Sequence, residues 1–166
     1  MRRYLICAIT VLAVLVLGAG CPGKNGVESV GPGALTPKEV VAAAKATIEQ
    51  WRQAYEVRSV EALGRLYARD LDLVVVHEGM AYLGWSSVDA MLKDRIARAS
   101  AIRIRLKDIQ VVSLAPDVAS AVATMTRELT EGPTTVTESG TLTLVLRKEG
   151  DGWVITAEHY SYRRPT

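Results

Sequence analysis

Hydrophobic and polar positions alternate in two stretches near the end of the chain, on either side of Glu149-Gly150-Asp151-Gly152. Leucines occupy every second position from Leu142 to Leu146. A period of two is typical of a half-buried strand, and Asp-Gly favours a tight hairpin turn. The pattern predicts a β-hairpin over residues 139–162, which needs cover from the rest of the chain. One face of its second strand comprises Trp153, Ile155, Ala157 and His159.

A helical period replaces this alternation in the first half of the chain. Thr36, Pro37 and Glu39 form an N-terminal capping signature, with proline at the first helical position. A second helix is predicted to begin near Ser59, and a third to be capped at Ser86-Ser87. The apolar stripe of the first helix comprises Val41, Ala44, Ile48, Trp51 and Tyr55.

The remaining apolar runs predict strands. A first strand is expected over residues 71–78, a short one at 80–83, and long strands from Ala101 onwards. Helices therefore come first and most strands last, which favours an α+β fold. We expect one strongly curved antiparallel sheet, with three helices from the N-terminal half packed on its concave face.

The N-terminus is typical of a bacterial lipoprotein signal peptide. Two arginines precede an apolar run from Leu5 to Leu17, and small residues then lead to Cys21. The run is shorter than a spanning helix needs. In the usual lipoprotein pattern a leucine lies three places before the cysteine, whereas here Gly18 takes that place and Leu17 lies one residue earlier. Plain secretion and an uncleaved anchor stay open as alternatives.

This interpretation divides the chain into three parts. Residues 1–20 form the signal peptide, 21–35 a Gly- and Pro-rich tether, and 36–166 the folded domain. We expect lipidation of Cys21 and a membrane-anchored protein of the cell envelope that faces the periplasm or the exterior. Cys7 is lost with the signal, so the domain has no cysteine for a disulfide, a catalytic thiol or a cysteine metal site.

Charge argues against nucleic acid as a partner. The chain has 20 Lys and Arg against 18 Asp and Glu, and loss of Arg2 and Arg3 leaves 18 against 18. Nucleic-acid-binding domains usually carry a basic excess. The basic stripe of Arg103, Arg105 and Lys107 is interpreted as a solvated face or as one side of cross-strand ion pairs, with an anionic partner or lipid headgroups as the alternative.

The order of these elements and the residues at their boundaries resemble the nuclear-transport-factor-2-like (SnoaL-like) superfamily, over about residues 36–162. Within it, the chain is most similar to the branch that looks like the association domain of calcium/calmodulin-dependent kinase II. The resembling segments are residues 51–55 with Leu63 and Tyr67, then 84–85, 140–147, 152–155 and 159–161.

This resemblance implies a cone-shaped sheet wrapped around a pocket that the helices close. Some members are enzymes, such as ketosteroid isomerase and scytalone dehydratase, and others only bind ligands or dimerise, so the fold does not determine the function. Aligned without gaps, this chain has Trp51 in place of the isomerase tyrosine and Val75 in place of its catalytic aspartate. Neither can supply the isomerase chemistry, which is therefore disfavoured.

The two histidines are the candidates for acid–base chemistry. His159, with a carboxylate such as Glu138, is the candidate catalytic pair, because imidazole titrates near neutrality. The alternative is that both histidines are strand-end residues bonded to water or backbone, and that Glu138 faces solvent beside an arginine. Two histidines without ligand spacing predict neither a metal site nor a cofactor. The candidate ligand-pocket residues are Tyr55, Tyr82, Trp85, His77 and His159.

Three hypotheses follow for function. The first is a lipid-anchored envelope domain that binds a small apolar or amphipathic molecule in the cone, without catalysis being implied; it predicts a largely apolar cavity. The second is an assembly module that forms a homodimer through the open sheet face. The third is a hydrolyase- or cyclase-like enzyme that uses His159 with a carboxylate.

Overall fold

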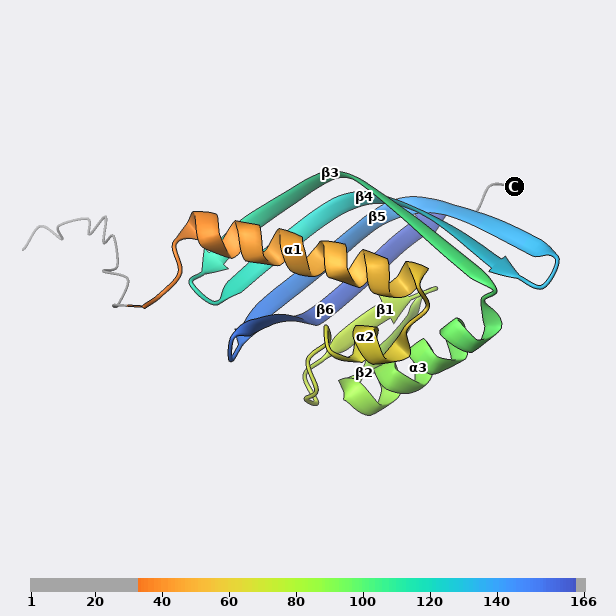
Figure 1. Ribbon diagram of the computed structural model, residues 1–166, viewed down its shortest axis with the longest axis horizontal. Coiled ribbons are helices and arrows are strands. Elements are labelled where there is room, and N and C mark those ends of the chain that lie inside the picture. The colour runs from red at the N-terminus through yellow and green to blue at the C-terminus, as the bar shows by residue number, and fades with distance from the viewer. Residues whose placement is uncertain (1–32, 164–166) are drawn as a thin grey trace, which may run out of the picture.

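The computed structural model describes residues 33–163, so the predicted signal peptide and Cys21 lie outside the described residues. None of the helices it describes is long and apolar enough to cross a membrane. The described part holds three helices and six strands (Figure 1). They are α1 (Pro37–Glu56), α2 (Val60–Gly64), β1 (Val74–His77), β2 (Met80–Leu83), α3 (Gly84–Arg98), β3 (Ala101–Ala115), β4 (Val118–Glu131), β5 (Thr134–Glu149) and β6 (Gly152–Arg163).

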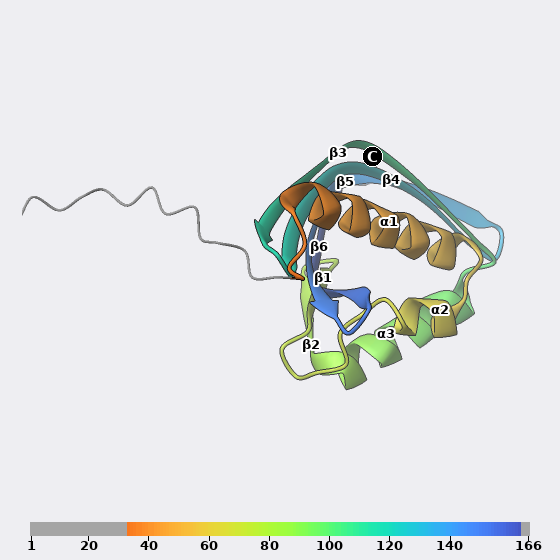
Figure 2. The same cartoon turned by 60° about the vertical axis from the view of Figure 1, so that its left-hand side comes forward.

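The six strands form one curved sheet in the order β2-β1-β6-β5-β4-β3. The long strands arch over α1, while α2 and α3 lie below it (Figure 2). This confirms the α+β prediction of a curved sheet with helices on its concave side. The expectation of a purely antiparallel sheet is wrong at one place, because β1 pairs with β6 in parallel. Alternation shows which side chains face inward, but it does not specify the direction of the neighbouring strand.

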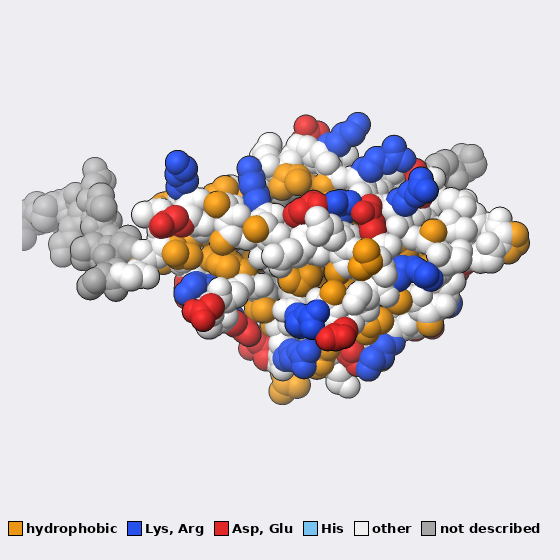
Figure 3. All heavy atoms as spheres, in the orientation of Figure 1, with side chains coloured by type: hydrophobic (Ala, Val, Ile, Leu, Met, Phe, Trp, Pro, Cys, Tyr) orange, Lys and Arg blue, Asp and Glu red, His pale blue; other side chains and the backbone are white. Residues whose placement is uncertain are grey.

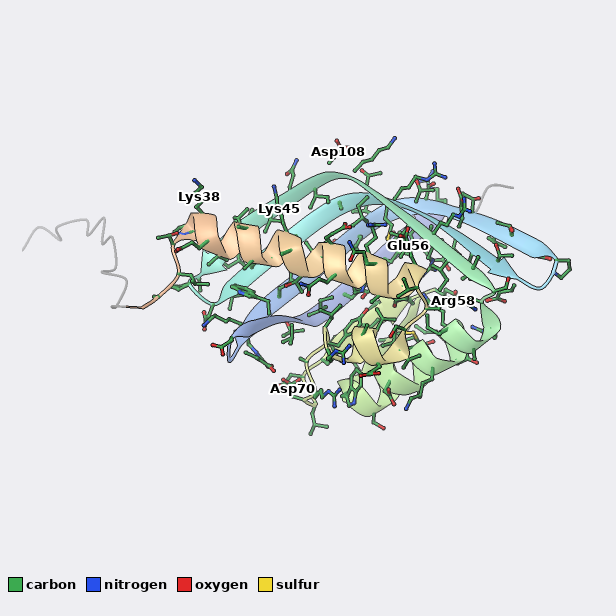
Figure 4. All side chains as sticks on the ribbon, in the orientation of Figure 1. Lys38, Lys45, Glu56, Arg58, Asp70 and Asp108 are labelled. Atoms are coloured by element: carbon green, nitrogen blue, oxygen red, sulfur yellow. The ribbon has the colours of Figure 1, made fainter. Side chains whose placement is uncertain are left out.

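Helix α1 lies against β3 and is fixed at both ends. At its start, the Thr36 and Glu39 side chains form the predicted capping box. At its end, Glu56 accepts a hydrogen bond from the backbone of Ile104 at 3.1 Å, and Arg58 donates to the carbonyl of Ala99 at 2.6 Å. Figure 4 shows Glu56 and Arg58 at this end of the helix. These bonds tie the helix to the edge strand of the sheet.

The predicted cap of α3 at Ser86-Ser87 is wrong. The helix begins at Gly84 after Leu83, and no side chain caps it. Its first amides are satisfied by backbone instead, since Gly84 N donates to the Leu73 carbonyl at 2.8 Å and Trp85 N to the Asp70 carbonyl at 3.0 Å. Backbone carbonyls of the segment before β1 therefore replace the expected serine cap.

A β-bulge in β6 changes which side chains face the core. Leu146 pairs with Ile155, whereas Val145 pairs with Ala157, so Thr156 is an extra residue in the strand. The inward face consequently shifts from Ile155 to Glu158, and His159 is exposed. The prediction that His159 shares a face with Trp153 and Ile155 is wrong for this reason.

Core side chains fill the hollow beneath the sheet. The large residues Trp51, Tyr55 and Tyr67 are each only 1% exposed, and the aliphatic side chains of β4 and β5 pack above them. Among the described residues, the small space between Ile48, Ala121 and Leu142 leaves no room for a water molecule, so the predicted largely apolar cavity is not confirmed there.

Candidate functional site

Five hydrogen-bonded polar side chains cross the core. Trp51 Nε1 donates to the Tyr67 hydroxyl at 2.8 Å, and that hydroxyl donates to one oxygen of Glu158. The other Glu158 oxygen lies 2.6 Å from His77 Nε2. Arg95 Nη1 lies 2.8 Å from His77 Nδ1. All five residues are at most 5% exposed, and we call them the polar network.

Each member of the polar network comes from a different part of the fold. Trp51 lies on α1, Tyr67 in the segment after α2, His77 at the end of β1, Arg95 on α3 and Glu158 on β6. The parallel pairing sets Val75 opposite Glu158, which brings β1 beside the network. A backbone bridge between Tyr67 and Ile155 fixes the tyrosine against the same strand. The network therefore joins the helices to the centre of the sheet.

The hydrogen-bond partners determine the protonation of His77. A guanidinium can only donate, so His77 Nδ1 must accept from Arg95 and carry no proton. The ring proton then lies on Nε2 and is donated to Glu158. His77 is a neutral imidazole between a buried cation and a buried carboxylate, and both ring nitrogens are engaged. It is a connector between charges rather than an available base.

The pKa shifts agree with this assignment. Burial lowers the pKa of His77 below its usual 6.5 and outweighs the opposing effect of Glu158. Burial alone would raise the pKa of Glu158, but hydrogen bonds from His77 and Tyr67 and the charge of Arg95 lower it overall. Burial also raises the pKa of Tyr67 well above 10, so its hydroxyl keeps its proton. The folded network thus holds one carboxylate and one guanidinium.

A second buried ion pair lies next to this network. Arg127 donates to Glu138 from Nη2 at 2.6 Å and from Nε at 3.0 Å, and both residues are at most 2% exposed. The guanidinium also stacks on the rings of Tyr160 and Tyr162, at 5.2 and 5.8 Å from their centroids. Arg127 and Glu138 face each other directly across β4 and β5. This pair neutralises itself inside the protein.

A cavity of about 370 Å³ opens between α3, the β1–β2 turn and the β4–β5 hairpin. We call it the mouth cavity. Arg95 lies in its wall, so one end of the polar network faces the cavity. Leu129 and Val136, which pair across β4 and β5, supply an apolar wall. The full lining comprises Glu78, Arg95, Arg98, Leu129, Glu131, Thr134, Val136 and Glu138.

The structure does not bring the candidate catalytic pair together. Glu138 is 1% exposed and bonded to Arg127, in the wall of the mouth cavity. His159 is exposed, on the opposite face of β6 from Glu158. It lines a second, open depression with Glu78 and Tyr160, and Glu78 also lines the mouth cavity. The arginine partner suggested for Glu138 is confirmed, but its expected solvent exposure is wrong.

The five candidate pocket residues lie at different places. Tyr55 is in the core, edge-on to Trp51, and His77 belongs to the polar network. Tyr82 and Trp85 are half-buried at β2 and at the start of α3, where Trp85 stacks with Arg69. None of the five lines the mouth cavity. Among the described residues, no three His, Cys, Asp or Glu side chains are grouped as a metal site requires.

Arg95 was absent from the sequence-based candidates, and the buried roles of Arg127 and Glu158 were not predicted. Arg95 stands near the apolar positions of α3 at helical spacing, which indicates a buried arginine in an amphipathic helix. Arg127 shows a similar signal, since it follows Ala121, Ala123 and Met125 at a period of two. Glu158 carried no such signal, because the bulge at Thr156 reverses the phase of its strand.

Comparison with known proteins agrees with this architecture. Residues 44–165 match the SnoaL-like domain family. The chain belongs to this family. No curated protein sequence matches it.

Solved structures of SnoaL-like and NTF2-like proteins share the fold. A proposed dehydratase of the NTF2-like family from Streptomyces avermitilis has 22% identity and a TM-score of 0.71, covering 77% of this chain and 99% of that one. A proposed scytalone dehydratase from Novosphingobium aromaticivorans has 11% identity and a TM-score of 0.69, covering 76% and 85%. A proposed calcium/calmodulin-dependent protein kinase type II association domain from Thiobacillus denitrificans has 24% identity and a TM-score of 0.61, covering 78% and 98%. At these identities the similarity establishes the fold alone.

Proposed function

We propose that this protein is a lipid-anchored cell-envelope domain that binds a small amphipathic molecule in the mouth cavity. One observation carries the proposal: the cavity combines the apolar pair Leu129 and Val136 with the guanidinium of Arg95, which is 5% exposed. Its volume of about 370 Å³ lies within the range of roughly 300–1,000 Å³ that is usual for small-molecule sites. Leu129 and Val136 give this largely polar cavity a small apolar wall, and placed polar groups fix the orientation of the ligand in small-molecule sites.

Binding is favoured over catalysis by the state of the polar groups. His77 has both ring nitrogens engaged and Glu138 is paired with Arg127, so neither is placed to take a proton from a ligand. His159 and Glu138 line different depressions, so this pair does not support the hydrolyase-like alternative. The SnoaL-like family contains both ligand-binding and dehydratase- or cyclase-type members, so the family does not decide between these functions.

Native mass spectrometry tests the proposed binding. The full chain, extracted gently from its host's envelope in native membrane particles, should release a protomer that carries a defined extra mass. Val136→Trp should lose that mass, because the indole fills the cavity beside Leu129. The matched control His159→Ala changes an exposed residue outside the cavity and should keep it. An empty wild-type protomer, or the same mass on Val136→Trp, would contradict binding in this cavity.

The lipid anchor rests on the sequence of residues 1–35. Fractionation of cells tests it separately from ligand binding. The wild-type protein should be found with membranes, and Cys21→Ala should release it or prevent its maturation. If Cys21→Ala fractionates and matures like the wild type, the anchor is not on this cysteine.

Homodimer formation is a second candidate, favoured by apolar side chains on the outer face of the sheet. Val112 is 57% and Val122 44% exposed on the neighbouring strands β3 and β4. Light scattering should show a dimer for the wild type and a monomer for Val112→Lys. A wild-type monomer at all concentrations would rule out this role, and ligand binding does not depend on it.

A further inference from the structure

We propose that the ligand carries an anionic group that binds Arg95 in place of the Glu78 carboxylate. The inference rests on the binding function proposed above and names the chemical class of the ligand: a small molecule with an anionic head and an apolar body. Glu78 is then the residue that sets the affinity of the site for anions.

Arg95 is held as a binding group by the polar network. Its Nη1 is engaged with His77 Nδ1 at 2.8 Å, which fixes the plane of the guanidinium. Its Nη2 lies 3.8 Å from Glu78 Oε1, beyond hydrogen-bond distance, and the residue lines the mouth cavity. An oriented guanidinium whose Nη2 makes no hydrogen bond with the described residues is suited to a carboxylate or phosphate oxygen, which it binds with charge-assisted hydrogen bonds.

The other charges around the cavity are already paired. Glu138 accepts two hydrogen bonds from Arg127. Glu131 lies 3.9 Å from Arg98, which also pairs with Asp94 at 3.0 Å. Arg95 is balanced on its inner side by Glu158, through neutral His77. An anion that replaces Glu78 at Arg95 therefore takes over an existing contact with a cation, whereas an added cation would have to compete with these arginines.

Glu78 is placed for displacement. It is the first residue of the two-residue turn between His77 and Met80, with φ of +54°, followed by Gly79 with φ of +76°. Such turns favour Asn, Asp or Gly at both positions, and a glutamate with positive φ is unusual. Its side chain is 43% exposed and can move into solvent when another anion arrives. The strained backbone thus presents a carboxylate at the entrance rather than deep in the site.

The opposite wall defines the rest of the ligand. Leu129 and Val136 face the cavity from β4 and β5, and Thr134 lies nearer the hairpin tip. Arg95 lies on α3, across the cavity from this hairpin. A ligand that contacts both walls needs a charged end toward α3 and an apolar part toward the hairpin. A short-chain carboxylate is the simplest molecule with this arrangement.

Fluorine NMR with matched probes tests the inference on the full chain in lipid nanodiscs. The probes are 6,6,6-trifluorohexanoate, the amine of the same length and the alcohol, with empty nanodiscs as the background. The carboxylate should bind most tightly. Glu78→Gln should tighten carboxylate binding by about fivefold and leave the alcohol unchanged, because it removes a competing charge that is partly screened by solvent. Glu61→Gln is the matched control, because this exposed carboxylate on α2 lies outside the cavity lining, and it should change affinity less than twofold.

The outcomes separate this inference from the proposed function. If the amine or the alcohol binds as tightly as the carboxylate or more tightly, and Val136→Trp abolishes that binding, the ligand is not anionic but small-molecule binding in the cavity still holds. No binding of any probe, together with an empty protomer in native mass spectrometry, would overturn both. Unchanged carboxylate affinity in Glu78→Gln would refute displacement. Arg95→Gln should abolish carboxylate binding. If Arg95→Gln fails to fold, Glu78→Gln still decides the test, because Glu78 is an exposed residue whose replacement does not disturb the core.

Discussion

Replacing Glu158 with glutamine removes one buried charge and keeps the shape of the side chain. The carboxylate is the acceptor for both Tyr67 and His77, and it balances Arg95 across the imidazole. Glutamine offers one acceptor and one donor. Arg95 keeps the ring proton of His77 on Nε2, and Trp51 already donates to the Tyr67 hydroxyl, whose own proton points at residue 158. The NH₂ group of glutamine would therefore meet another donor on whichever side it lies. Glu158→Gln therefore leaves an unpaired donor and an unbalanced guanidinium.

The expected cost is large for a single isosteric change. Breaking a buried ion pair by removing one partner typically costs about 3–5 kcal/mol. Whole domains are stable by only about 5–15 kcal/mol, so this is a third or more of the total for many of them. A change of that size should lower the melting temperature by roughly 10–20 °C in a domain of this length.

Thermal and urea unfolding, followed by circular dichroism at pH 7.5, measure this cost. Glu128→Gln is the matched control, since Glu128 pairs with the 67%-exposed Arg105 on the surface and should contribute at most about 1 kcal/mol. If Glu158→Gln is no more destabilising than this control, the carboxyl group is already neutral in the folded protein. The charged network and the assigned histidine tautomer would then be wrong.

Three further predictions follow from other parts of the structure. Because burial lowers the pKa of His77, the unfolded chain takes up a proton before the folded protein does as pH falls below about 6.5. The free energy of unfolding should therefore decline below this pH. His77→Gln should remove the decline, as measured by the urea concentration at the midpoint of unfolding. Tyr55 has a buried hydroxyl that makes no hydrogen bond with any described residue although it neighbours Tyr67. In the same assay, Tyr55→Phe should leave the free energy of unfolding unchanged, whereas Tyr67→Phe should lower it by about 1–3 kcal/mol. A Cβ on Gly140 would lie 1.9 Å from the carbonyl oxygen of Ser161, so Gly140→Ala should separate β5 from β6 and lower the free energy of unfolding by several kcal/mol. A Cβ on Gly152 would lie 3.8 Å from its nearest neighbour, so Gly152→Ala should melt near the wild-type temperature.

Local signals in the sequence predicted the elements well. The capping box at Thr36 and Glu39 depends on a few neighbouring residues and forms as expected, and α2 begins at Val60, close to the predicted start near Ser59. The stripe of α1 was nearly right, with Val40 buried in place of Val41. The surface also agrees with the even balance of charge, since acidic and basic side chains are interspersed on the face in Figure 3.

The site was harder to predict because it depends on contacts between distant segments. Glu158 points inward only because Thr156 is inserted in β6, and nothing local distinguishes a bulged strand from a regular one. His77 was a candidate for its chemistry, but its partners lie 81 and 18 residues away. Tyr82 and Trp85 were chosen as large amphipathic side chains, a property that does not show which surface they face.

The central place of β6 has a consequence for the order in which the protein is made. Residues 152–163 are synthesised after all the other strands, yet β6 lies between β1 and β5 in the sheet. Until it emerges from the ribosome, the β1–β2 hairpin has no edge to join, and Tyr67 and His77 lack their acceptor on Glu158. The polypeptide should therefore remain open to chaperones and to a translocation channel throughout its synthesis, and close in one late step.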